Sequence, residues 1–155
     1  LMSAPVLMII GISTGFGRIL TITQVPSAIA NMILGITNSK ILVLLLINVL
    51  LLIVGTFMET NAAIIILTPI LLPIVTMLGV DLIHFGIIVV MNLSIGFITP
   101  PLGANLFMAC QVGEISFDEL VKKIWPWIFV MIVLLMMITY IPKISLCLPK
   151  ALGMI

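Results

Sequence analysis

The stretch Gly96-Phe-Ile-Thr-Pro-Pro-Leu-Gly103 lies in the middle of an apolar segment that is long enough to cross a bilayer. Its two adjacent prolines remove two backbone donors and end a helix, and its glycines allow backbone angles that other residues avoid. Lipid cannot satisfy the freed backbone groups, which must therefore be buried in protein or face a watery cavity. Secondary transporters hold substrates and coupling ions at such broken helices. The stretch therefore predicts part of a membrane transporter.

The composition of the chain is that of a membrane protein. Apolar residues make up 63% of the 155 residues, charged residues make up 7%, and the mean hydropathy is +1.50. A soluble domain has about 45–50% apolar and about 25% charged residues. The basic residues are too few and too scattered to form a patch for nucleic acid. One histidine and two distant cysteines give no zinc spacing, and the sequence contains neither a Walker motif nor Gly-x-Ser-x-Gly. We therefore expect no enzyme and no transition-metal site.

The first half of the chain predicts two kinds of membrane element. Residues 1–40 are expected to form a transmembrane helix and a short interfacial helix. Residues 41–80 contain two apolar legs on either side of the polar stretch Gly55-Thr-Phe-Met-Glu-Thr-Asn61. The first leg, of about 14 residues, is short for a hydrocarbon core of about 30 Å. These legs predict a re-entrant helical hairpin, and the alternative is two ordinary spans joined by an external loop.

The second half predicts a discontinuous transmembrane helix over residues 81–113, interrupted between Gly96 and Gly103. Residues 114–124 are expected to form an amphipathic cytoplasmic helix, because Ser116 and Glu119 have the spacing of a capping box. Residues 125–155 are expected to form the last transmembrane helix and a tail. The fold class is therefore an all-α, polytopic membrane protein.

The adjacent pair Lys122-Lys123 predicts the orientation of these elements. Cytoplasmic loops of membrane proteins carry an excess of lysine and arginine. This pair therefore places residues 114–124 in the cytoplasm, and the hairpin then enters the membrane from the outer side.

The helix break carries the first candidate site residues. Sodium takes oxygen ligands, and the carbonyls between Gly96 and Gly103 together with the Thr99 hydroxyl supply them without a formal charge. The alternative is a proline kink that only shapes the packing of helices.

The polar tip of the hairpin carries the second candidates. Thr56, Thr60 and Asn61 offer oxygen ligands or contacts to a polar substrate. Glu59 is an acid at predicted membrane depth, which by default suggests a functional site. Its alternative role is an exposed acid at the start of the second leg, where the helix dipole favours negative charge. Asn92, Ser94 and Asn105 flank the break, and each also fits a hydrogen bond between helices. His84 lies beside Asp81 and is expected to be structural.

The order and spacing of these blocks resemble the large membrane subunit of tripartite ATP-independent periplasmic (TRAP) transporters. The resemblance covers residues 41–155, and more loosely 1–40, and corresponds to the C-terminal third of such a subunit. It rests on these blocks: Gly55-Thr-Phe-Met-Glu59, Pro69-Ile-Leu-Leu-Pro73, Gly79-Val-Asp81, His84-Phe-Gly86, Asn92-Leu-Ser-Ile-Gly96, Thr99-Pro-Pro-Leu-Gly103, Asn105-Leu-Phe107 and Leu146-Cys-Leu-Pro149.

The resemblance implies an elevator-type transporter of the ion-transporter superfamily, built from two inverted repeats, of which this chain holds the second hairpin and broken helix. It implies sodium-coupled uptake of small organic acids, such as C4-dicarboxylates or sialic acid, across the bacterial inner membrane. The implied partners are a soluble periplasmic binding protein and a small four-helix membrane subunit. The alternative functions are an ion channel, another organic-anion transporter of the superfamily, an intramembrane enzyme that uses His84, and a pure scaffold.

The resemblance also implies the roles of individual residues. The sodium-binding residues would be Gly55, Thr56, Gly96, Thr99 and Gly103. The substrate-binding residues would be Glu59, Thr60, Asn61, Pro100 and Asn105. The family commonly has aspartate where Glu59 stands, so the longer side chain changes this part of the expected substrate site.

Overall fold

The computed structural model describes residues 39–58, 60–100 and 103–153, together with three single residues near the N-terminus. The helices expected in residues 1–38 lie outside this part of the chain, as do Glu59 and Pro101. The described residues form six helices: α3 (Lys40–Phe57), α4 (Thr60–Met77), α5 (Leu82–Gly96), α6 (Ala104–Gly113), α7 (Phe117–Tyr140) and α8 (Pro142–Ala151).

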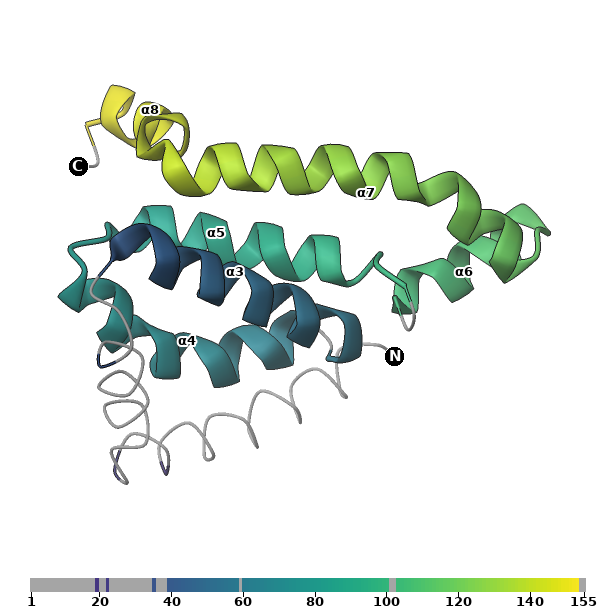
Figure 1. The fold of residues 1–155 in the computed structure, drawn as a ribbon, viewed down its shortest axis with the longest axis horizontal. Coiled ribbons are helices and arrows are strands. Elements are labelled where there is room, and N and C mark those ends of the chain that lie inside the picture. Colours follow the sequence, from purple (N-terminus) through teal and green to yellow (C-terminus); the bar gives the residue numbers. More distant parts are fainter. Residues whose placement is uncertain are drawn as a thin grey trace.

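Helix α5 lies at the centre of the arrangement (Figure 1). Helix α3 runs alongside it in the same direction, α4 lies on the other side of α3 in the view, and α7 returns along the opposite side. The hydrophobic core is built mainly by α3, α4 and α5, with Leu51, Ile74 and Phe85 among its fully buried side chains. Helix α8 turns across the end of α7 and contacts α5.

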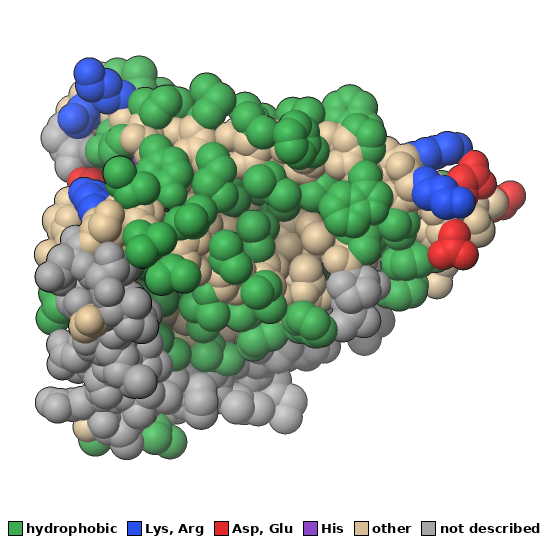
Figure 2. Space-filling view, viewed as in Figure 1, with side chains coloured by type: hydrophobic (Ala, Val, Ile, Leu, Met, Phe, Trp, Pro, Cys, Tyr) green, Lys and Arg blue, Asp and Glu red, His purple; other side chains and the backbone are tan. Residues whose placement is uncertain are grey.

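The surface of the molecule fits a membrane. Helices α3, α4 and α7 are each long and apolar enough to cross a bilayer. Apolar side chains cover the middle of the face in Figure 2, and the charged side chains gather at its two ends. This distribution and the helical architecture confirm the expected fold class, an all-α membrane protein.

The first of the two legs around residues 55–61 is longer than the sequence predicted. Helix α3 has 18 residues because it continues through Gly55 and Thr56 to Phe57. The Thr56 hydroxyl donates to the carbonyl of Ile53 at 2.7 Å, which satisfies this polar side chain within the helix. The expectation of a leg too short to span was therefore wrong, and the re-entrant hairpin stays a prediction without that support.

The break in the second half lies where the sequence predicted it. Helix α5 ends at Gly96 and α6 begins at Ala104. Asp81 caps the start of α5, because its carboxylate accepts from the backbone N–H groups of Ile83 and His84 at 2.9 and 3.2 Å.

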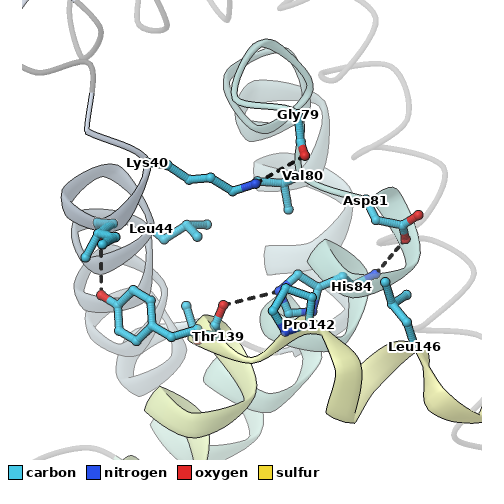
Figure 3. A pocket seen from close by; sticks show the side chains of 11 residues that line it. Lys40, Leu44, Gly79, Val80, Asp81, His84, Thr139, Pro142 and Leu146 are labelled. Atoms are coloured by element: carbon cyan, nitrogen blue, oxygen red, sulfur yellow. Dashed lines mark hydrogen bonds between the residues drawn. The ribbon is translucent and has the colours of Figure 1, made fainter.

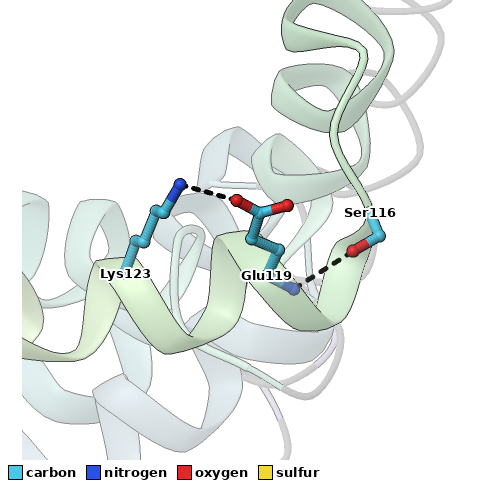
Figure 4. Close-up of polar contacts among 3 residues, drawn as sticks. All are labelled: Ser116, Glu119 and Lys123. Atoms are coloured by element: carbon cyan, nitrogen blue, oxygen red, sulfur yellow. Dashed lines mark hydrogen bonds and ion pairs between the residues drawn. The ribbon is translucent and has the colours of Figure 1, made fainter.

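The segment 114–124 does not form a separate helix. Helix α7 begins at Phe117 and continues past Pro126 to Tyr140, so that the charged turns and the last span are one helix. The expected cap is confirmed, since the Ser116 hydroxyl accepts from the backbone N–H of Glu119 at 3.3 Å (Figure 4). Lys123 also pairs with the Glu119 carboxylate at 2.7 Å.

Helix α8 was not predicted, because the residues after the last span were expected to form a tail. Proline is also favoured at the first position of a helix, since its missing N–H has no partner there in any case. Pro142 occupies this position at the start of α8, a helix of 10 residues. The expected tail is therefore an ordered helix that buries Ser145 and Leu146.

The positions of the lysines do not support the predicted orientation. Lys122 and Lys123 lie near the start of α7, whereas Lys40, Lys143 and Lys150 lie at the opposite end, on α3 and α8 (Figure 1). The positive-inside rule counts basic residues, and three lysines at one end outnumber the pair at the other. The orientation therefore remains a prediction that the described lysines do not favour.

Candidate functional site

Helices α3 and α5 meet through their backbones where α5 ends. A β-carbon on Gly96 would lie 2.7 Å from the Cα and the carbonyl carbon of Gly55, and 2.8 Å from the carbonyl oxygen of Leu52. Real β-carbons essentially never come within 3.0 Å of such atoms. Glycine is therefore required at position 96, and the two predicted sodium-site glycines are brought together.

A groove of about 290 Å³ lies beside this contact, between the end of α3 and the helix break. Its polar side chains are the hydroxyls of Thr56, from α3, and Thr99, from the break. Among the described residues, the lining consists of Leu52, Ile53, Thr56, Phe57, Thr99 and Pro100. The structure therefore places two predicted sodium ligands and one predicted substrate residue on the same surface.

Both hydroxyls are oriented by their own helical turns. Thr56 donates to the Ile53 carbonyl at 2.7 Å, and Thr99 donates to the Ile95 carbonyl at 2.6 Å. A hydroxyl has one donor and two acceptor lone pairs, so donation into the backbone leaves the oxygen available as an acceptor or a cation ligand. The groove therefore presents two uncharged hydroxyl oxygens, each of which can ligate a cation, among apolar side chains.

The backbone of the break is more ordered than the sequence suggested. The Thr99 N–H donates to the Gly96 carbonyl at 2.9 Å, and the Gly103 N–H donates to the Thr99 carbonyl at 3.1 Å. A β-carbon on Gly103 would lie 2.9 Å from that same Thr99 oxygen. These carbonyls therefore each accept one hydrogen bond, and their second lone pair is what remains for a ligand.

The other predicted substrate residues do not line this groove. Thr60 begins α4, Asn61 follows it as an exposed residue, and Asn105 is exposed on α6. Glu59 lies outside the described residues. Their proposed contacts with substrate stay predictions.

Sequence reasoning missed a buried polar cluster that joins four helices. Its members are Asn48 of α3, His84 and Asn92 of α5, Thr139 of α7 and Ser145 of α8. Asn48 is the single polar residue in the apolar run 41–54, and the expected hydrogen bond of Asn92 to another helix is confirmed, with Asn48 as its partner. The expected structural role of His84 agrees with its contacts, because its ring nitrogens lie 3.0 Å from the Ser145 hydroxyl and 3.2 Å from the Thr139 carbonyl.

A second pocket, of about 300 Å³, lies at the other end of α3 and α5 (Figure 3). Lys40 reaches across it to the carbonyl of Gly79 at 3.2 Å, and His84 and Thr139 form part of its wall. None of the predicted sodium or substrate residues lines this pocket. The groove at the break is therefore the better candidate site, although the two spaces are similar in volume.

Comparison with known proteins shows the family to which the chain belongs. Residues 1–144 match the family model described as "Tripartite ATP-independent periplasmic transporter, DctM component". The chain belongs to this family. The DctM family consists of transporter components, which agrees with the expectation that the chain is not an enzyme.

Several relatives of known name share the match. The chain is 54% identical, over 93% of its length, to the isethionate TRAP transporter permease protein DctMQ of Oleidesulfovibrio alaskensis. It is 45% identical, over 90% of its length, to the C4-dicarboxylate TRAP transporter large permease protein DctM of Pseudomonas aeruginosa. It is 38% identical, over 93% of its length, to the sialic acid TRAP transporter large permease protein SiaM of Vibrio cholerae. The chain spans 23%, 33% and 34% of these relatives, respectively.

Proposed function

We propose that this chain is part of the large membrane subunit of a TRAP transporter that takes up a small organic acid with sodium. The family match supports the transporter class, and the names of the relatives, which specify isethionate, C4-dicarboxylate and sialic acid, support an organic acid as substrate. The subunit would act in the bacterial inner membrane with a small four-helix membrane subunit and a periplasmic substrate-binding protein.

The observation that carries the sodium proposal is the groove that joins Thr56 and Thr99. A coupling ion in a membrane requires oxygen ligands where formal charge is costly, and the interrupted helices of transporters provide them. The two hydroxyl oxygens, each with its proton donated to a backbone carbonyl, fit this requirement. Gly55 and Gly96 allow α3 and α5 to approach closely enough for both hydroxyls to line one groove.

An elevator mechanism is part of the same proposal. The backbone contact of α3 with α5, together with the hydrogen bond between Asn92 and Asn48, supports it, because helices held in both ways move as one body. Substrate residues in the part of the large subunit that this chain does not span would complete the site.

The test is to replace Thr99 in the intact transporter, reconstituted with its partners in vesicles. Thr99→Val keeps the branched shape and removes the hydroxyl, and we expect it to raise the sodium concentration for half-maximal uptake at least several-fold. Thr76→Val is the matched control, because Thr76 also donates to carbonyls of its own helix, at 2.9 Å, but lies on α4 outside the groove. Uptake that does not depend on sodium, or equal sodium curves for both variants, would contradict the proposal.

A further inference from the structure

The buried polar cluster forms a chain of hydrogen bonds across the molecule. The Asn92 Nδ2 donates to Asn48 Oδ1 at 2.6 Å and to the carbonyl of Ile88 at 2.8 Å. The Asn48 Nδ2 donates to the Thr139 hydroxyl at 3.0 Å. The side chains of Asn48 and Asn92 are fully buried. Buried amides of this kind are costly to leave unpaired, so each bond fixes the orientation of the next.

This chain of hydrogen bonds has two separable parts. Asn48 and Asn92 join α3, which lines the candidate groove, to α5, which leads into the break on the other side of the groove. His84 and Ser145 join α5 to α8 at the other end, where the second pocket lies. Because the Thr139 carbonyl only accepts, His84 Nε2 donates to it, and His84 Nδ1 shares the other hydrogen bond with the Ser145 hydroxyl.

From this arrangement, and on the basis of the proposed sodium site, we infer that Asn48 and Asn92 are positioning residues for that site. The contact between Gly55 and Gly96 brings the helices close but is non-directional, so it does not by itself stop α3 from sliding or rotating on α5. The bond between the two amides is directional, and sliding by one helical residue moves a side chain by about 1.5 Å, enough to break it. The amide pair therefore sets the register in which Thr56 and Thr99 face one groove.

One atom of the pair indicates that Asn92 fixes how α3 and α5 pack on each other and does not stabilise the fold. Asn92 Oδ1 is buried and has no hydrogen-bond partner in the described part of the chain. A buried acceptor left unpaired destabilises the fold, so an apolar residue of the same shape would suit this position better if packing alone mattered. Asn92 is retained for the directional bond that its amide donates to α3.

The experiment is a double-mutant cycle of Asn48→Leu and Asn92→Leu in the intact, reconstituted transporter. Leucine keeps the branched shape of asparagine. We expect either single variant to raise the sodium concentration for half-maximal uptake about tenfold, which corresponds to about 1.4 kcal/mol, the size of one lost buried hydrogen bond. The double variant should have no larger effect than Asn48→Leu alone, because both substitutions remove the bond between the two amides and Asn48→Leu also removes the bond to Thr139. Ser145→Ala is the matched control, expected to lower the melting temperature and leave the sodium dependence unchanged.

A second measurement tests the register without using sodium. Val49 and Val90 are exposed on α3 and α5, with relative exposures of 47% and 50%, and accept spin labels in a background without other labelled sites. The distance distribution between the labels should broaden or shift in Asn92→Leu and stay unchanged in Ser145→Ala. An unchanged distribution, or additive effects of the two substitutions on sodium dependence, would overturn this inference while leaving the proposed function intact. A wild-type transporter that needs no sodium would overturn the proposed function itself.

Discussion

Helix α5, which packs closely on α3, and the long helix α7 differ in how much of their surface is buried inside the protein. Eight of the 15 residues of α5 are buried, whereas only three of the 24 residues of α7 are. Helix α7 is nonetheless long and apolar enough to cross a membrane and presents large exposed side chains such as Trp127 and Phe129. Both α5 and α7 are apolar, so hydropathy does not reveal which of them lies next to the candidate site.

The difference lies in the small and polar residues. Helices in lipid gain little from apolar contact with each other, so their close association depends on small residues and hydrogen bonds. The α3–α5 contact has both, in Gly55, Gly96, Asn48 and Asn92. Helix α7 packs against α5 and contributes Thr139 to the polar cluster near its end, and most of its remaining side chains are not buried.

The largest expected effect comes from adding a methyl group to the centre of this contact. Gly96→Ala would place a β-carbon 2.7 Å from the backbone of α3, which forces the helices apart. We expect the variant to lose transport and most of its detergent-stable yield. Both quantities are measured on the purified subunit complex, by uptake in vesicles and by size-exclusion chromatography.

Gly86→Ala on the same helix is the control with the opposite expected sign. Nothing lies within 4 Å of a β-carbon at this position, which is exposed. Alanine in an exposed helix interior is favoured over glycine by about 1 kcal/mol, so the melting temperature should stay the same or rise. Equal losses of transport and of detergent-stable yield in both variants would show that the close α3–α5 contact is not what makes Gly96→Ala harmful.

The next largest effect is expected at the helix break. Replacing Pro100 and Pro101 together by alanine restores two backbone donors and supplies the best helix former, so α5 should extend towards α6. Insertion should stay normal while uptake falls sharply and sodium binding weakens. Wild-type sodium affinity in a well-assembled double variant would show that the helix break is not needed for sodium binding.

The sequence allowed the break to be located because its signal is local. Adjacent prolines between glycines indicate directly where a helix is interrupted, and in the structure α5 ends and α6 begins on either side of them. The length of α3 was not predictable in the same way, because Gly55 and Thr56 are weak helix formers that this helix includes through a tertiary contact and an internal hydrogen bond. Tertiary context overrides such propensities.

The buried cluster escaped prediction because its partners are distant in the sequence. Asn48 pairs with Thr139, which lies 91 residues further along the chain. A single asparagine in an apolar run indicates a hydrogen bond between helices but does not name the partner. Helix α8 escaped for a different reason, since a proline such as Pro142 is compatible with both the end and the start of a helix.

The smallest expected effect tests the other side of the comparison, the exposed face of α7. Phe129 is 68% exposed and Phe85 is 2% exposed. Phe85→Ala should reduce the free energy of unfolding by about 3–5 kcal/mol because it leaves a cavity in the core. Phe129→Ala should change it by less than about 0.5 kcal/mol, since lipid or detergent chains replace the lost contacts. Denaturant unfolding of both variants in the same detergent measures this difference. A loss at Phe129 comparable to that at Phe85 would mean that another protein segment covers this face of α7 in the intact transporter, so that α7, like α3 and α5, belongs to a protein interface.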